Sequence, residues 1–358
     1  MLKSFCLVLV SVLVFLTVSP SASGAVISEK LLNQAGLSTG WQSAIALNAG
    51  EKVRRIDVLG DYLYILTDTN YLFCLDRNTG KLGFAVTIAL PKMPVSAPSS
   101  YKNTTYIVAE NKLIAFDTLR RTEISRMILP MPVSAAAATN EKYIYLPGMD
   151  KRLHILDANG GHELFKVTAD NVSGITSVLA TDASVIFATD GGNVICMQTS
   201  EPKRLWQFNA VGGITAPLTS TADWIYASSR DTNLYKLKNT TGEQMWKFHA
   251  GSALTTPARA AQTAVYQYAG DKGLYAIDAN SGKQLWLLPD GIDLLAQNGN
   301  TAYVMDKNNT CVVMDNQQAK NIYTINFAPV TAYAANADDA KIYVMDGKNI
   351  SCIVPAVK

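Results

Sequence analysis

The chain alternates short apolar runs with compact polar turns, and this pattern is clearest at residues 274–286. Leu274-Tyr-Ala-Ile277 is apolar at every position, as expected for a strand that is covered on both faces. Asp278-Ala-Asn-Ser-Gly282 has the composition of a tight turn, because Asp and Asn bond to nearby backbone and Gly adopts a left-handed conformation. Trp286 follows Asp278 by eight residues. The stretch therefore predicts a strand, a turn and a second strand.

The same arrangement recurs along the chain with a spacing of 37 to 41 residues. The turn position holds Asp76, Asp117, Asp157, Gln198, Lys238, Asp278, Asp315 and Val354. The position eight residues later holds Phe84, Ser125, Phe165, Trp206, Trp246, Trp286 and Tyr323. The eighth such position would fall at residue 362, so we expect Trp41 to supply it. In that case the strand Trp41–Leu47 is the outermost strand of the last unit.

Each unit also contains an upstream hairpin, as in Ile214–Ala227. Four short strands in a unit of about 40 residues are typical of a propeller blade. We therefore predict an all-β fold, an eight-bladed β-propeller of four-stranded antiparallel blades closed by an N-terminal strand. It forms a single domain over residues 41–358. Pro98, Pro217 and Pro257 are expected within the innermost strands, because an edge strand tolerates the missing donor of proline.

The first 25 residues do not follow the repeat. Lys3 precedes an apolar run from Phe5 to Val18, and small residues then lead to Ala25. This pattern predicts a secretory signal peptide at residues 1–25, cleaved near Ala25. A retained membrane anchor is the alternative, although the apolar run is shorter than the ~20 residues that a spanning helix needs. We expect an exported protein, periplasmic or extracellular.

Residues 26–40 predict one short N-terminal helix, with Ser28 as its cap and Gly36 at its end. Cys6 lies too early for a lipid-attachment site, so we expect no lipid on the mature protein. Removing Lys3 with the signal leaves 30 basic and 29 acidic residues. Such a balance gives no electrostatic basis for nucleic-acid binding. We expect a monomer with no membrane span after cleavage.

Candidate chemistry is sparse. The three histidines, His154, His162 and His249, have no His or Cys partner at metal-ligand spacing. Turns of different units contain Asp68, Asp190, Asp231, Asp271, Asp306 and Asp346, together with Asn70, Asn193, Asn233 and Asn308. These residues could bind calcium, but hairpin turns require the same residue types. We predict no catalytic, cofactor-binding or metal-binding residue and no cofactor.

Four cysteines remain after signal cleavage: Cys74, Cys196, Cys311 and Cys352. Three of them replace Ala276 in the repeat, and Cys311 replaces Leu274. Such positions are small and buried, and cysteine behaves as a small hydrophobic residue there. We expect four free thiols, although an exported protein could also form a disulfide.

The phrases Leu274–Trp286 and Thr240-Thr-Gly242-Glu-Gln-Met-Trp246 resemble the pyrroloquinoline-quinone-like (PQQ-like) repeat β-propellers. The resemblance covers about residues 41–354. One branch of that family consists of quinoprotein dehydrogenases, which hold the quinone with adjacent cysteines, a tryptophan and calcium ligands. This chain has no neighbouring cysteines, and no residue can be carried over from that cofactor site.

Another branch of the family contains an eight-bladed lipoprotein of the machinery that assembles outer-membrane β-barrels. The number of units and the predicted signal peptide are similar to that branch, whereas its lipid-attachment cysteine is missing. The resemblance implies a non-catalytic scaffold that binds protein partners in the cell envelope. The alternative is a propeller that binds a quinone or another small ligand.

Overall fold

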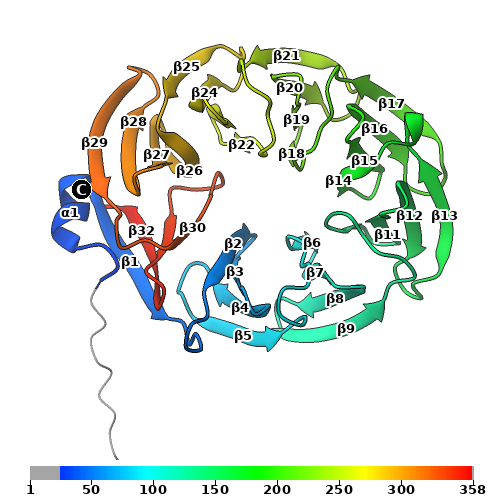
Figure 1. Cartoon of the computed structure of the whole chain (residues 1–358), viewed down its shortest axis with the longest axis horizontal. Helices are drawn as coiled ribbons and strands as arrows, with labels where there is room; N and C mark the ends of the chain where they lie inside the picture. Colours follow the sequence, from blue (N-terminus) through cyan, green and yellow to red (C-terminus); the bar gives the residue numbers. More distant parts are fainter. Residues whose placement is uncertain (1–24, 357–358) are drawn as a thin grey trace, which may run out of the picture.

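Eight four-stranded antiparallel sheets are arranged as a ring (Figure 1). The computed structural model describes residues 25–356, so the predicted signal peptide lies almost wholly outside the described residues. In seven of the sheets the first strand lies near the centre of the ring and the last lies at its circumference, and in the eighth β1 is the outermost strand. The prediction of an eight-bladed, all-β propeller is confirmed.

The first seven blades each use four consecutive strands. Blade 1 contains β2 (Val53–Leu59), β3 (Tyr62–Thr67), β4 (Tyr71–Asp76) and β5 (Leu82–Thr87), and blade 2 contains β6 (Ser99–Tyr101), β7 (Thr104–Ala109), β8 (Lys112–Asp117) and β9 (Thr122–Ile128). Blade 3 contains β10 (Ala138–Thr139), β11 (Tyr143–Pro147), β12 (Arg152–Asp157) and β13 (Glu163–Thr168). Blade 4 contains β14 (Ile175–Ala180), β15 (Ser184–Thr189), β16 (Asn193–Gln198) and β17 (Arg204–Asn209). Blade 5 contains β18 (Thr219–Ser220), β19 (Trp224–Ser228), β20 (Asn233–Lys238) and β21 (Gln244–His249). Blade 6 contains β22 (Arg259–Ala260), β23 (Ala264–Ala269), β24 (Gly273–Asp278) and β25 (Gln284–Leu288). Blade 7 contains β26 (Gly291–Asn298), β27 (Thr301–Asp306), β28 (Thr310–Asp315) and β29 (Lys320–Asn326). A 3-10 turn, η1 (Asp170–Val172), precedes blade 4.

Blade 8 joins the two ends of the described chain. It consists of β30 (Ala332–Ala334), β31 (Ile342–Met345), β32 (Asn349–Pro355) and, outermost, β1 (Leu37–Ala44). Closure by an N-terminal strand is therefore confirmed, but the expected bounds Trp41–Leu47 are wrong. The strand begins earlier because a β-bulge absorbs the residue between Thr39 and Trp41, so pairing with β32 continues back to Leu37.

A short helix, α1 (Glu29–Gln34), precedes β1 within the range where we expected one. Gly36 has a φ of +69°, and its N–H bonds to the carbonyl of Asn33, so it ends the helix as predicted. Ser28 occupies the N-cap position, but its side chain makes no capping hydrogen bond. The expected capping role of Ser28 is therefore wrong.

The innermost strands are short in the blades that contain the expected prolines. Pro98, Pro217 and Pro257 lie one or two residues before β6, β18 and β22, each of which has two or three residues. Our expectation placed them inside these strands. Each of these strands begins only after its proline, which has no N–H to donate to the ladder. The segment before Pro98 makes an isolated bridge between Val95 and Ala109.

The repeated aromatic position falls at one point of every blade, where a β-bulge interrupts the pairing of the two outer strands. Trp206 lies opposite Cys196 and Trp286 lies opposite Ala276, and the bulge follows each pair. The same position holds Trp41, Phe84, Ser125, Phe165, Trp246 and Tyr323 in the other blades. The bulge turns these side chains toward the following blade.

Tryptophan rings at this position pack on a glycine of the next blade. A Cβ atom on Gly242 would overlap the ring of Trp206, and the indole N–H of Trp206 donates to the carbonyl oxygen of Asn239 at 3.0 Å. The same arrangement joins Trp41 to Gly80 and Trp246 to Gly282. Each of these glycines also has a positive φ, near +70°. The recurring glycine thus serves both the turn and the interface between blades.

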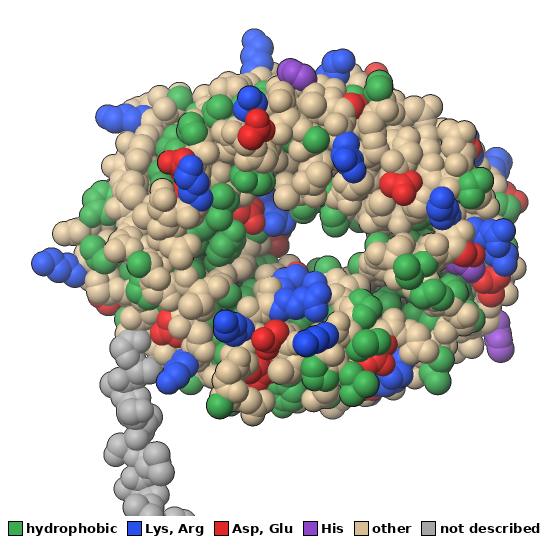
Figure 2. Space-filling model, viewed as in Figure 1, with side chains coloured by type: hydrophobic (Ala, Val, Ile, Leu, Met, Phe, Trp, Pro, Cys, Tyr) green, Lys and Arg blue, Asp and Glu red, His purple; other side chains and the backbone are tan. Residues whose placement is uncertain are grey.

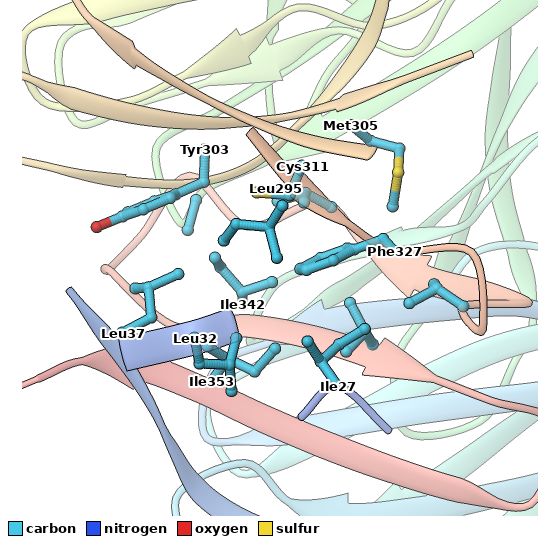
Figure 3. Close-up of a cluster of buried hydrophobic side chains, with 14 of the residues drawn as sticks. Ile27, Leu32, Leu37, Leu295, Tyr303, Met305, Cys311, Phe327, Ile342 and Ile353 are labelled. Carbon is cyan, nitrogen blue, oxygen red and sulfur yellow. The ribbon is translucent and has the colours of Figure 1, made fainter. Parts of the chain in front are cut away.

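Buried hydrophobic clusters include residues from neighbouring blades, which explains why the predicted strands are apolar on both faces. One cluster contains Leu32 of α1, Leu37 of β1, Ile353 of β32 and Phe327, which follows β29 (Figure 3). This cluster packs the N-terminal segment against blades 7 and 8. The segment is therefore part of the core.

A buried arginine also fastens blade 8 to blade 1. Arg77 lies in the outer turn of blade 1, and its guanidinium donates to Asp339 at 2.6 Å and to the hydroxyl of Tyr343 at 3.1 Å, both in blade 8. Burial acts to raise the pKa of Asp339. Hydrogen bonds from the Lys341 N–H and the Asn336 amide, with the charge of Arg77, outweigh this effect and leave that pKa lowered.

We predict that the closing strand is required for stability. Trp41→Ala should lower the free energy of unfolding by roughly 3–5 kcal/mol, because it removes a large side chain from the interface between the first and last blades. Deleting residues 26–47 should lower the melting temperature sharply, since blade 8 then lacks its outer strand. Thermal unfolding followed by circular dichroism measures both. Deleting residues 26–35 alone is the control that removes α1 and keeps β1, and an unchanged melting curve for the longer deletion would contradict the prediction.

We predict that Gly242→Ala destabilises the protein more than Gly60→Ala. Both glycines have a positive φ, so alanine costs about 1–2 kcal/mol at either position. A Cβ at Gly60 meets no atom within 4 Å, whereas at Gly242 it overlaps Trp206 and should cost about 1–3 kcal/mol more. Urea unfolding of the two variants isolates the contact with the ring. Equal losses of stability would show that the contact contributes nothing.

The lowered pKa of Asp339 predicts how blade closure depends on pH. A carboxylate whose pKa is lowered by folding stabilises the protein above its ordinary value, near 3.8, and this stabilisation is lost as the pH falls through the lowered value. Asp339→Asn should therefore cost about 1–2 kcal/mol near pH 7 and progressively less in acid. Asp338→Asn, at a more exposed neighbour 3.6 Å from Arg77, is the control and should have a smaller effect. A constant difference between Asp339→Asn and wild type across this range would refute the assignment.

Candidate functional site

The predicted repeat aromatics do not form a common site. Trp41, Phe84, Phe165, Trp206, Trp246, Trp286 and Tyr323 each lie on the outer strand of a different blade. Phe84 stacks on Phe116 of blade 2 at a centroid distance of 4.8 Å, and the hydroxyl of Tyr323 donates to Gln34 of α1 at 2.8 Å. These side chains hold neighbouring elements together, so a binding site has to be sought elsewhere.

The histidines and cysteines are dispersed over the ring. His154 is buried on β12, with Nδ1 2.5 Å from Glu163 and Nε2 3.0 Å from Asp150. Both partners belong to the same blade, so the ring is fixed within it. The four cysteines within residues 25–356 are buried and free, in blades 1, 4, 7 and 8. Burial raises the pKa of the Cys74 and Cys352 thiols to about 12, which keeps them protonated at neutral pH.

The loop aspartates serve their own turns. One carboxylate oxygen of Asp231 accepts the backbone N–H of Asn233, and the other accepts the hydroxyl of Tyr235. Asp306 likewise accepts the N–H groups of Asn308 and Thr310. Within residues 25–356, no group of three or more His, Cys, Asp or Glu side chains is placed to hold a metal ion.

Two adjoining cavities lie along the inner strands of the ring. The larger, of about 900 Å³, extends along blades 1 to 5 and is lined mainly by small side chains such as Ala135 and Ser177. The smaller, of about 500 Å³, lies between blades 1, 6, 7 and 8 and contains most of the charged residues of the inner wall. Arg54, Leu59 and Pro98 line both cavities. Figure 2 shows the opening at the centre of the ring, with basic side chains at its lower edge.

One rim of the ring exposes apolar side chains. This rim is formed by the loops between the second and third strands and by the connections between blades. Hydrogen bonds from Leu90 to Glu110, from Met149 to Pro132 and from Val211 to Asp231 tie the two sets of loops together. Its exposed large hydrophobic residues are Leu90, Met93, Met149, Val172 and Val211. We call these five residues the apolar arc.

The apolar arc is confined to one part of the rim. Its members lie on the loops of blades 1 to 5, and Val211 is 95% exposed. Figure 2 shows hydrophobic side chains gathered at the lower right of the ring, over the blades of β6–β9 and β10–β13. In blades 6 to 8, the loops that correspond to the one holding Met149 read Gly270-Asp-Lys272, Lys307-Asn-Asn309 and Asp346-Gly-Lys348. In the connections that follow blades 5 and 7, the large hydrophobic residues Leu254, Phe327 and Val330 are buried. A repeat fold does not require this asymmetry.

Neither the apolar arc nor Arg54 was found from the sequence. A usable signal was present for Met149, because it is a large apolar residue in a loop where the other units have polar residues and glycine. Comparing these loops with one another would have revealed Met149, but not the arc residues in the connections between blades. Finding Arg54 requires knowledge of how β2 pairs with β3, and the sequence pattern does not give this register.

No helix among the described residues is long and apolar enough to cross a membrane. A model of the LVIVD repeat matches residues 50–76. No curated protein sequence gives a significant match.

Two solved structures share the fold. BamB from Moraxella catarrhalis superposes with a TM-score of 0.65 at 17% identity, over 89% of this chain and 99% of that chain. The computationally designed Ika8 protein superposes with a TM-score of 0.62 at 15% identity, over 85% of this chain and 96% of that chain. Identities this low establish the architecture alone.

The repeats themselves also match a family model. The model described as outer membrane protein assembly factor BamB matches residues 111–213 and 198–328, which together are more than half of the chain. These residues include the three blades whose repeated tryptophans, Trp206, Trp246 and Trp286, are intact. The chain is a PQQ-like repeat propeller and belongs to the family of the outer membrane protein assembly factor BamB.

Proposed function

We propose that this protein is an exported, non-catalytic scaffold that binds protein partners in the cell envelope during outer-membrane protein assembly. The observation that supports this function best is the apolar arc. Large hydrophobic side chains exposed together on a folded protein mark interaction surfaces, because leaving them in water costs free energy. A protein partner that covers the arc recovers that free energy.

The rigidity of the ring suits such a role. Every blade is packed between two others, and the arc lies on loops that hydrogen bonds hold in place, such as the N–H of Val211 to Asp231 at 3.1 Å. A preordered surface loses little conformational entropy when it binds. Loops on a rigid scaffold are common sites of recognition.

A non-catalytic role is supported by where the reactive groups lie. His154 is enclosed by Asp150 and Glu163 of its own blade and lines neither cavity. The cavity carboxylates Asp57 and Asp293 are each paired with an arginine. Catalysis by general acid and base requires such groups to converge on one reacting atom, and here they are committed to structural contacts.

The test is capture of envelope proteins by a variant that lacks the arc. We expect the mature protein, used as bait in an envelope extract, to retain subunits of the outer-membrane assembly machinery, identified by mass spectrometry. The double variant Met149→Ser with Val211→Ser should lose most of this capture, since both side chains are exposed and contribute little to the core. Circular dichroism checks that the fold is kept.

The matched control is Leu119→Ser with Leu164→Ser, which removes two exposed leucines outside the arc. It should capture the same subunits as wild type. Equal capture by the arc variant would refute binding through this surface. Stoichiometric binding of pyrroloquinoline quinone in the presence of calcium, with turnover of an alcohol or sugar, would refute the non-catalytic role.

A further inference from the structure

We propose that the central cavities bind the free carboxylate end of an extended peptide, and that Arg54 holds the carboxylate. This site is separate from the apolar arc and does not depend on the function proposed above. The inference rests on the placement of one arginine, on the ion pairs around it and on the main chain that lines the larger cavity.

A β-bulge places Arg54 in the channel wall. On β2, Val53 pairs with Thr67 and Arg55 pairs with Leu66, so Arg54 is the extra residue between them. A bulge of this kind redirects a side chain away from the regular alternation of a strand. Arg54 is exposed and lines both cavities at the place where they adjoin.

Arg54 differs from the other charged residues of the two cavities because it has no ionic partner among residues 25–356. Arg55 pairs with Asp57 at 2.5 Å, and Arg259 forms two hydrogen bonds of 3.0 Å with Asp293. Glu110, in the larger cavity, pairs with Lys112 at 3.1 Å. The guanidinium of Arg54 therefore has its donors available for a ligand.

The charge around Arg54 favours a ligand with a single negative charge. The smaller cavity contains three arginines and two aspartates, so its wall carries a net charge of +1. Asp57 and Asp293 would repel a phosphate or another multiply charged anion. A carboxylate matches both the single unpaired charge and the planar fork of donors that a guanidinium presents.

The larger cavity supplies what an extended chain needs beyond its carboxylate. The segment before β10 contains Ala135 and Ala136, whose backbone groups make no hydrogen bond within the described part of the chain. The backbone groups of Thr215, before β18, likewise make no hydrogen bond within the described part of the chain. These residues line the cavity, and their small side chains leave the main chain accessible. Unpaired main chain of this kind bonds readily to an extended peptide.

The size of the site limits the ligand. A cavity of about 900 Å³ is within the ~300–1,000 Å³ range of sites for small ligands. It suits the last few residues of a chain but excludes a folded domain.

The test uses an N-acetylated hexapeptide of alternating serine and alanine in two forms, one with a free carboxylate as its only charge and one with an uncharged, amidated end. Isothermal titration calorimetry with the mature protein should detect binding of the free acid. Amidation, or the substitution Arg54→Gln, should weaken it by roughly ten- to hundredfold, as expected when a hydrogen-bonded charge pair is lost. Arg54→Lys keeps the charge without the fork and should fall between these limits.

The matched control is Arg230→Gln, which removes an exposed arginine that lines neither cavity. It should bind the free acid as wild type does, and circular dichroism should show that all variants are folded. The proposal is overturned if the free acid does not bind, if the amide binds equally well, or if Arg54→Gln leaves the affinity unchanged. If acetate bound as tightly as the free-acid peptide, the proposal would also be overturned, because the rest of the peptide would then contribute nothing to binding.

Discussion

The ring depends on one repeated contact, in which an aromatic side chain on the outer strand of a blade packs on the turn of the next blade. The contact is most complete where tryptophan meets glycine, as Trp206 meets Gly242, because the ring fills the space that a Cβ would occupy. Its indole N–H also bonds to the same turn. Because each blade is held by its neighbours, closing the last interface with Trp41 determines whether the ring is complete.

Blades that lack this pair show what can replace it. Blade 2 has Ser125 at the aromatic position, and there Met127, two residues later, lies against Gly161 of blade 3. Blade 7 has Tyr323, whose hydroxyl reaches α1 instead. The interface therefore tolerates loss of the aromatic ring when another side chain covers the turn or when an added element packs outside it.

The repeat was sufficient to predict the number of blades, their strand content and the closure of the ring, since those features follow from spacing and from the turn residues. It was insufficient for the ends of strands. The start of β1 at Leu37 depends on a bulge at Gly40, and the length of an inner strand depends on where pairing resumes after a proline such as Pro217. Neither is set by local preference, because both are decided by the register with the neighbouring strand.

The binding surfaces were not predictable in the same way, and the reason is physical. Selection for the ring acts on the turn and interface positions, so those positions are alike from blade to blade. The loops of the rim and the inner edges bear less of the packing, and a change there costs little stability. Function in a propeller is therefore found where the units differ. Val211 and Arg54 are both departures of this kind. Val211 exposes a large hydrophobic side chain where the next connection has Gly251, and Arg54 directs a charge into a wall whose remaining charges are paired.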